Sequence, residues 1–152
     1  MISIGNARVG RGAPPFIIAE MSGNHNQSLE RAFELVDAAA YAGVQALKLQ
    51  TYTEETITMN IDHGDFLVSD KDSLWAGCNL YDLYKKAHTP WEWHAPIMDR
   101  ARKHGLEVFS SPFDESAIDF LETLNVPAYK IASFENIHLP LIAKAAATGK
   151  PL

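Results

Sequence analysis

The segment FIIAEMSGNHN, residues 16–26, runs from four apolar residues into a carboxylate and then into a polar loop. A continuous apolar run of this kind indicates a parallel strand that is buried on both faces. Its polar end, at Glu20, would lie at the carboxyl edge of the sheet, where open α/β sheets and α/β barrels bind their ligands. The alternative is that Glu20 simply ends the strand and faces water.

The same pattern of an apolar strand with a polar end recurs three more times. Strands are predicted at residues 16–20, 46–50, 107–111 and 128–132, and each is followed by a helical pattern that ends shortly before the next strand. The helix ends share one design, in which a Gly or Asn that tolerates a left-handed backbone precedes two connecting residues and an apolar residue. A repeating β/α unit predicts a parallel sheet, either doubly wound or closed into a barrel.

Four β/α units are half of an eight-stranded barrel, and half a barrel leaves strand edges unpaired. We therefore expect an α/β fold, the (β/α)8 TIM barrel, of which the chain supplies about the first four units as the front part of a longer protein. An intact, small, doubly wound domain is the alternative. Residues 1–15 are expected to form an irregular lead-in or a small hairpin, and residues 16–152 the N-terminal half of the barrel. Residues of about 51–88 contain several aromatic side chains and are expected to form a structured excursion over the site.

Composition narrows the function classes. The 152 residues carry a net charge of −6 with scattered basic residues, which argues against nucleic acid or an anionic membrane as partner. The one cysteine, Cys78, excludes an internal disulfide and fits a reducing cytoplasm. No apolar run reaches about 18 residues, so we expect neither a secretion signal nor a membrane span, and the cytoplasm as the compartment.

Two local patterns carry further expectations. Thr89-Pro90-Trp91-Glu92 has the features of a helix start, because Thr can cap, Pro suits the first helical position and Glu92 completes a capping box. His25 could be a ligand, an acid–base group or a hydrogen-bonding scaffold residue.

No spacing of His, Cys, Asp and Glu makes a complete metal site. The remaining histidines are expected at surface or capping positions: His63, His88, His94, His104 and His138.

Polar side chains stand at the ends of all four predicted strands: Glu20, Lys48, Gln50, Ser110, Ser111, Lys130, Ser133 and Glu135. Lys48 and Gln50 are two residues apart, so strand alternation places them on one face. Two cations with small hydroxyl groups at one mouth indicate a site for phosphate and carboxylate. The lysines could instead form ion pairs with Glu20 or Glu135, or one of them could form a Schiff base.

As a set, these motifs resemble the sialic acid synthase family. The likeness rests on Phe16–Glu20, Gly23-Asn24-His25, Lys48-Leu49-Gln50, Phe109–Phe113 and Pro127–Ser133, in that order. Residues 20–26 and 73–93 look more like the pseudaminic acid synthase branch of the family. Phe134, where the sialic branch tends to have Gly, supports the same branch.

The resemblance implies that phosphoenolpyruvate condenses with an open-chain diacetamido trideoxy altrose to give pseudaminic acid and phosphate. It implies that Lys48, Ser111, Lys130 and Ser133 hold phosphoenolpyruvate, that Gln50, Glu135, Asn24 and His25 lie near the sugar, and that Glu20 is catalytic. In the family a divalent cation, manganese or magnesium, polarises the sugar aldehyde. Its histidine ligands follow the fifth strand, beyond residue 152, so no metal ligand is assigned within this chain.

The family also has a small C-terminal antifreeze-like domain, absent from residues 1–152, that helps to close the site across a homodimer. We therefore expect the full-length protein to be a homodimer and the 152-residue chain alone to be inactive. Three other functions stay open. They are an N-acetylneuraminate synthase that uses N-acetylmannosamine, a Schiff-base aldolase at Lys48 or Lys130, and a half barrel that binds anions without catalysis.

Overall fold

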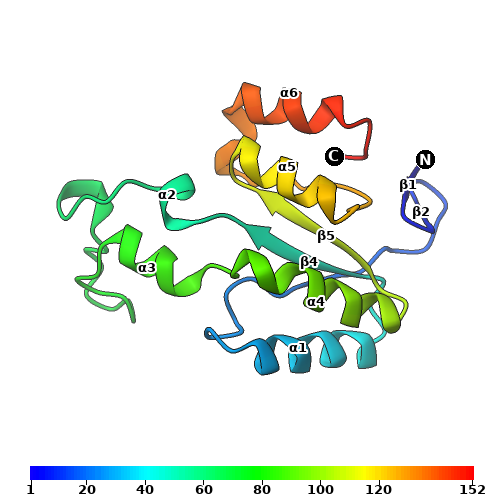
Figure 1. Cartoon of the computed structure of the whole chain (residues 1–152), viewed down its shortest axis with the longest axis horizontal. Helices are drawn as coiled ribbons and strands as arrows, with labels where there is room; N and C mark the ends of the chain where they lie inside the picture. The colour runs from blue at the N-terminus through cyan, green and yellow to red at the C-terminus, as the bar shows by residue number, and fades with distance from the viewer.

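The computed structural model describes all 152 residues, and a parallel sheet forms its centre (Figure 1). The strand order is β3-β4-β5, with β3 at Ile18–Glu20, β4 at Ala46–Thr51 and β5 at Glu107–Pro112. Both strand pairs are parallel, in the registers Glu20↔Lys48 and Gln50↔Ser111. The sheet therefore brings the polar ends of three predicted strands to one edge.

Four helices cover this sheet in two contacting pairs, α1 with α4 and α5 with α6 (Figure 1). Their bounds are α1 Leu29–Tyr41, α4 Trp91–Lys103, α5 Glu115–Thr123 and α6 Leu139–Ala147. The predicted helices are confirmed, with α1 beginning after Ser28, whose hydroxyl accepts from the Arg31 amide. The predicted left-handed exits are present too, with φ of +77° at Gly105 and +52° at Asn125.

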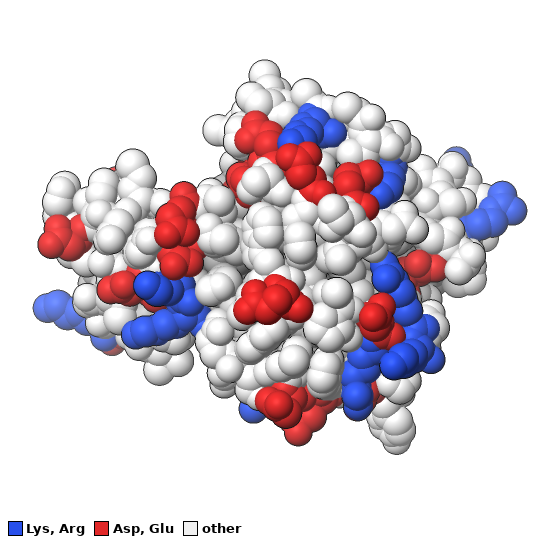
Figure 2. All heavy atoms as spheres, viewed as in Figure 1, with Lys and Arg blue, Asp and Glu red and all other residues white.

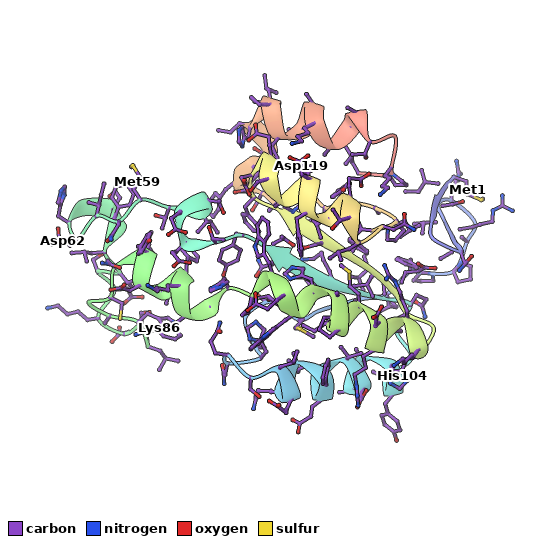
Figure 3. All side chains as sticks on the ribbon, in the orientation of Figure 1. Met1, Met59, Asp62, Lys86, His104 and Asp119 are labelled. Carbon is purple, nitrogen blue, oxygen red and sulfur yellow. The ribbon has the colours of Figure 1, made fainter.

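A charged cluster at the surface joins the C-terminal half of α1 to the C-terminal end of α4. The Arg100 guanidinium donates to both carboxylate oxygens of Asp37, and His104 lies 3.0 Å from the same carboxylate. The hydrogen bond that Asp37 accepts from Arg100 lowers the pKa of Asp37 to about 2. Figure 3 labels His104 at the end of α4 beside α1. Figure 2 shows charges of both signs on this face, with basic side chains gathered around the end of α4, whose last turn carries Arg100, Arg102 and Lys103.

Two parts of the chain lie outside the β/α units. The predicted lead-in is an antiparallel hairpin of β1 (Ile2–Ile4) and β2 (Ala7–Val9), held to β5 by the Asn6 amide, which donates to the Glu107 carboxylate at 2.8 Å. The excursion is structured as predicted and contains α2 (Glu54–Ile57), η1 (Gly64–Phe66) and α3 (Leu80–Ala87). It extends away from the sheet, with Met59 and Asp62 at its far end (Figure 3). None of the helices has the length and apolar character needed to cross a membrane.

Two sequence predictions were wrong in detail. Residues 128–132 form no regular strand, because one bridge, Ser110↔Tyr129, joins them to β5 before the chain turns into η2 (Phe134–Ile137). The α4 helix begins after Pro90, and Thr89 makes no cap. The Thr89 hydroxyl lies instead 3.1 Å from Nε2 of His25, in a different part of the fold.

The apolar core fills the space between the sheet and its helices. Leu47 and Leu49 of β4 pack there with Ile97, Met98 and Ala101 of α4. All five side chains are buried, and a buried aliphatic side chain contributes about 1.5 to 3 kcal/mol relative to its exposed state. This core holds the β/α units together beneath the carboxyl edge of the sheet.

The core packing predicts the effect of shortening one buried side chain of α4. Ile97→Ala should lower the free energy of unfolding by about 2 to 5 kcal/mol, because it opens a cavity at a side chain with no exposed surface. Tyr41→Ala is the control, since the Tyr41 side chain at the end of α1 is 94% exposed. Urea titration followed by circular dichroism measures both. Equal losses for the two variants would contradict this description of the core.

Candidate substrate site at the carboxyl edge of the sheet

A cavity of about 600 Å³ opens where the strands end. Gln50 from β4 lies on its wall with Lys130, Ser133 and Glu135, which belong to the fourth unit and precede α6. The structure thus brings together four residues that the sequence assigned to the site. Another cavity, of about 620 Å³, lies at the opposite edge beside the hairpin, around Glu107 and Lys150, and contains none of them.

One side of this cavity is apolar and comes largely from the excursion. Ile57, Tyr84 and Ala87 line it together with Tyr52 and Phe113. The Tyr52 ring meets Tyr84 and Phe113 edge-on, with ring centroids 5.7 Å and 5.3 Å apart. Burial raises the pKa of Tyr52 to about 12, so its hydroxyl stays protonated. These contacts place part of residues 51–88 on the wall of the cavity.

Lys48 and Glu20 form an ion pair at the ends of β4 and β3. The Lys48 Nζ atom lies 3.4 Å from a Glu20 carboxylate oxygen, and the two side chains are 7% and 64% exposed. Their register pairing places both on one face of the sheet. The ion-pair alternative considered for Lys48 is therefore present, and it places a carboxylate beside a nearly buried lysine side chain.

Two polar atoms near the edge are buried without a hydrogen-bond partner. They are the Ser111 hydroxyl oxygen and one carboxylate oxygen of Glu135, Oε2. Ser111 is 1% exposed and is the register partner of Gln50. A buried polar group without a partner costs roughly 1 to 3 kcal/mol, so such groups are uncommon unless a ligand or water satisfies them. Both atoms belong to residues that the sequence assigned to substrate.

Gln50 is oriented by the loop after β3. The Ser22 hydroxyl donates to the Gln50 side-chain carbonyl at 2.8 Å. Ser22 itself has a φ of +49°, a conformation that non-glycine residues seldom adopt outside tight turns and functional loops. This bond leaves the two N–H groups of the Gln50 amide as the donors available to a ligand.

The structure places Asn24 and His25 in the internal bonding of this loop and not on the cavity wall. The Asn24 amide donates to the carbonyl of Met21 at 3.0 Å. His25 has no exposed surface, its Nδ1 accepts from the Gln27 amide, and its Nε2–H therefore donates to Thr89. Burial and the neighbouring His88 lower the pKa of His25. Of the three roles considered for His25, its geometry favours the scaffold role.

Sequence reasoning missed His94, which was expected at the surface. His94 has no exposed surface and lies 2.9 Å from the Thr51 hydroxyl, which in turn lies 2.6 Å from the Ser110 hydroxyl. Burial lowers the pKa of His94 to about 4. The sequence does contain a pattern that indicates burial of His94. Residues 94, 97, 98 and 101 have the spacing of one helical face, and the last three are apolar core residues.

No group of three or more His, Cys, Asp or Glu side chains in the chain is arranged to hold a metal ion. The residues present therefore do not make a metal centre by themselves.

The fold and the cavity define a class: a parallel β/α protein with cationic, hydroxyl and carboxylate groups at the carboxyl edge of its sheet. Comparison with known proteins makes this specific. Residues 35–152 match the NeuB family, and the chain belongs to that family.

Named relatives agree. The chain is 50% identical over 139 residues to pseudaminic acid synthase of Helicobacter pylori, covering 91% of this chain and 40% of that protein. It is 49% identical over 120 residues to pseudaminic acid synthase of Campylobacter jejuni, covering 79% and 34%. The chain thus spans about 40% or less of the length of these relatives.

Solved structures show the same fold. An N-acetylneuraminic acid synthetase from Leptospira borgpetersenii, in complex with citrate, superposes with a TM-score of 0.78 at 28% identity, over 98% of this chain and 47% of that one. The spore coat polysaccharide biosynthesis protein spsE of Bacillus subtilis gives 0.75 at 35% identity, over 99% and 38%. The α/β fold with a parallel sheet is therefore shared with sialic acid synthase structures.

The buried state of His94 predicts a pH dependence of stability. The unfolded chain protonates this histidine near its ordinary pKa of 6.5, but the folded chain does so only near 4. The neutral ring thus contributes stability that is fully present above pH 6.5 and is lost as pH falls toward 4, by up to about 3 kcal/mol. Urea titrations from pH 7 to pH 4 measure this.

In these titrations His94→Gln should show a shallower loss of stability with falling pH than the unmodified chain. His63→Gln, at an exposed position on the excursion, is the matched control and should keep the original slope. A parallel pH profile for His94→Gln would show that this histidine is not the group responsible.

Proposed function

We propose that the chain is the phosphoenolpyruvate-binding part of a nonulosonic acid synthase. In the whole protein, phosphoenolpyruvate would condense with an open-chain acetamido sugar and release phosphate. Family membership and the identity to pseudaminic acid synthases support this proposal. The observation that carries it is the buried, unpartnered hydroxyl of Ser111 beside strand ends that hold Lys48 and Gln50.

Phosphoenolpyruvate presents a phosphate and a carboxylate, which need fixed cations and hydroxyl donors. We assign these roles to Lys48 and Lys130 as the cations and to Ser111 and Ser133 as the hydroxyl donors. The Ser111 hydroxyl gains a hydrogen bond that it lacks in the free chain. Lys48 is held in place by Glu20 before the ligand arrives, which lowers the conformational entropy lost on binding.

The second substrate would occupy the cavity at the strand ends, on the side that faces the excursion. The Gln50 amide offers N–H donors there, and the unpartnered Glu135 oxygen accepts from a hydroxyl or an amide N–H. The apolar wall at Ile57 and Tyr84 suits methyl groups. A diacetamido trideoxy altrose has more methyl groups than N-acetylmannosamine, so this wall supports pseudaminic acid as the product.

In the proposed reaction, C3 of phosphoenolpyruvate forms a bond to the aldehyde carbon of the sugar. Water adds to the oxocarbenium carbon C2, and the C2–O bond to phosphate then breaks to leave the 2-keto acid. Of the two protons of this water, one ends on the former aldehyde oxygen and the other leaves with phosphate. Glu20 is the proposed group that takes a proton from water or stabilises the cation, because its carboxylate is mostly exposed and lies beside Lys48. Asn24 and His25 would act by shaping the loop that holds Ser22.

For the whole protein we propose a complete (β/α)8 barrel, with residues 1–15 as lead-in and residues 16–152 as its N-terminal half. The succession of β/α units in this chain supports the proposal, as does the length of the Helicobacter pylori relative, of which the match covers 40%. A divalent cation, Mn²⁺ or Mg²⁺, would be held by residues after Leu152. We further propose a cytoplasmic homodimer that uses neither nucleic acid nor membrane as partner.

Phosphate release tests the proposed function. The product of the complete reading frame is incubated with phosphoenolpyruvate, Mn²⁺ and either the diacetamido trideoxy altrose or N-acetylmannosamine. We expect release with the altrose derivative only. Release with N-acetylmannosamine alone would move the protein to the sialic branch, and release with neither would refute a synthase.

Replacing a lysine tests how the anion is held. Lys130→Met should raise the KM for phosphoenolpyruvate by about 30-fold or more, because it removes a charge-assisted contact of about 2 kcal/mol or more. Lys144→Met is the control, since Lys144 pairs with Asp119 between α6 and α5, away from the cavity. A separate assay treats the enzyme and a keto substrate with borohydride, which traps a Schiff base on a lysine as a covalent adduct. Covalent trapping at Lys48 or Lys130 would favour the Schiff-base aldolase instead.

A further inference from the structure

A continuous chain of hydrogen bonds crosses the buried space between α4 and the carboxyl ends of β4 and β5. It runs from the Ser110 hydroxyl to the Thr51 hydroxyl (2.6 Å), then to Nε2 of His94 (2.9 Å), and ends at the Pro90 carbonyl, 3.2 Å from Nδ1. Ser110, Thr51 and His94 have no exposed surface. This polar chain lies within an otherwise apolar layer.

The direction of every bond in this chain is fixed by its last acceptor. A backbone carbonyl can only accept, so the His94 Nδ1 atom carries the proton and Nε2 is left as an acceptor. Thr51 must then donate to Nε2, and Ser110 must donate to Thr51. Because burial keeps the ring neutral, one arrangement of protons satisfies all three side chains.

The bond between Thr51 and Ser110 lies directly behind two proposed substrate residues. Strand alternation places Thr51 and Ser110 on the face toward α4, and their neighbours Gln50 and Ser111 on the opposite face. Gln50 and Ser111 are register partners in β4 and β5. The polar chain therefore fixes two strands against each other at the residues where their mouth-facing side chains meet.

We propose that His94 is a positioning residue, which acts through Thr51 and Ser110 to hold β5 against β4 and so to orient the Ser111 hydroxyl for phosphoenolpyruvate. This inference rests on the proposed function. Apolar contacts at Ile97, Met98 and Ala101 already hold α4 to the sheet, so the polar chain adds orientation where apolar packing alone leaves freedom. Supporting groups behind a site commonly change substrate affinity when removed, because they orient the groups that touch the ligand.

The test uses the product of the complete reading frame and steady-state kinetics with both substrates. His94→Leu and Thr51→Val should each raise the KM for phosphoenolpyruvate by about tenfold, as expected for loss of a buried hydrogen bond behind the site. The KM for the sugar should change by less than about threefold, because Ser22 also holds Gln50. The double variant should be no worse than either single variant, since both break the same chain.

Two controls separate positioning from stability. His94→Gln can return an acceptor to Thr51 and should bring the KM for phosphoenolpyruvate back to within about threefold of the original enzyme. Ile97→Ala lowers stability from the same helix without touching the polar chain, and should leave that KM unchanged. If His94→Leu fails to fold, Thr51→Val and Ser110→Ala make the same test with smaller changes.

The outcomes are distinct. An original enzyme that releases no phosphate refutes the proposed function before the variants are compared. If the original enzyme is active and the variants lose thermal stability but keep the KM for phosphoenolpyruvate within twofold, His94 is only structural and the inference is wrong. A rise in that KM for Ile97→Ala equal to that for His94→Leu would overturn it as well.

Discussion

The register of β4 against β5 is the constraint on which the site depends. Six consecutive residue pairs join the two strands, from Ala46↔Glu107 to Thr51↔Pro112. Since side chains alternate, a slip of one residue would turn Lys48 and Gln50 toward the helices and bring leucines to the mouth. The core opposes this slip, because Leu47 and Leu49 are buried in the cluster that contains Ile97 and Met98 of α4 and would leave it. Hydrophobic burial thus selects which polar residues can reach a ligand.

Polar groups are buried on both faces of the sheet at this edge, with opposite consequences. Toward the helices, His94, Thr51 and Ser110 satisfy one another and the Pro90 carbonyl. Toward the mouth, the Ser111 hydroxyl is left without a partner. A fully paired network rigidifies, whereas an unpaired buried group has an unfavourable free energy until something binds it. The same few residues of two strands therefore supply both a rigid support and an unsatisfied donor.

Sequence alone could predict the elements of regular, local origin. Helix α1 was found through Ser28 and its apolar stripe, and the three strands through apolar runs with polar ends. The expected strand at residues 128–132 failed because strand formation depends on partners, and here one bridge to β5 is made. Local patterns carry no information about that pairing. The barrel therefore stays a proposal for the whole protein.

Long-range partnerships explain the other misses at the site. Thr89 has every local feature of a helix cap, yet its hydroxyl bonds His25, which is 64 residues away in the chain. His94 carried a local signal in its spacing from Ile97 and Met98, but polarity alone favoured a surface position. What made burial possible was Thr51, on a strand that the sequence could not place beside His94. The lesson for such sites is physical: a buried histidine is stable only where distant residues complete its hydrogen bonds, so its position is decided by the fold and not by its own segment.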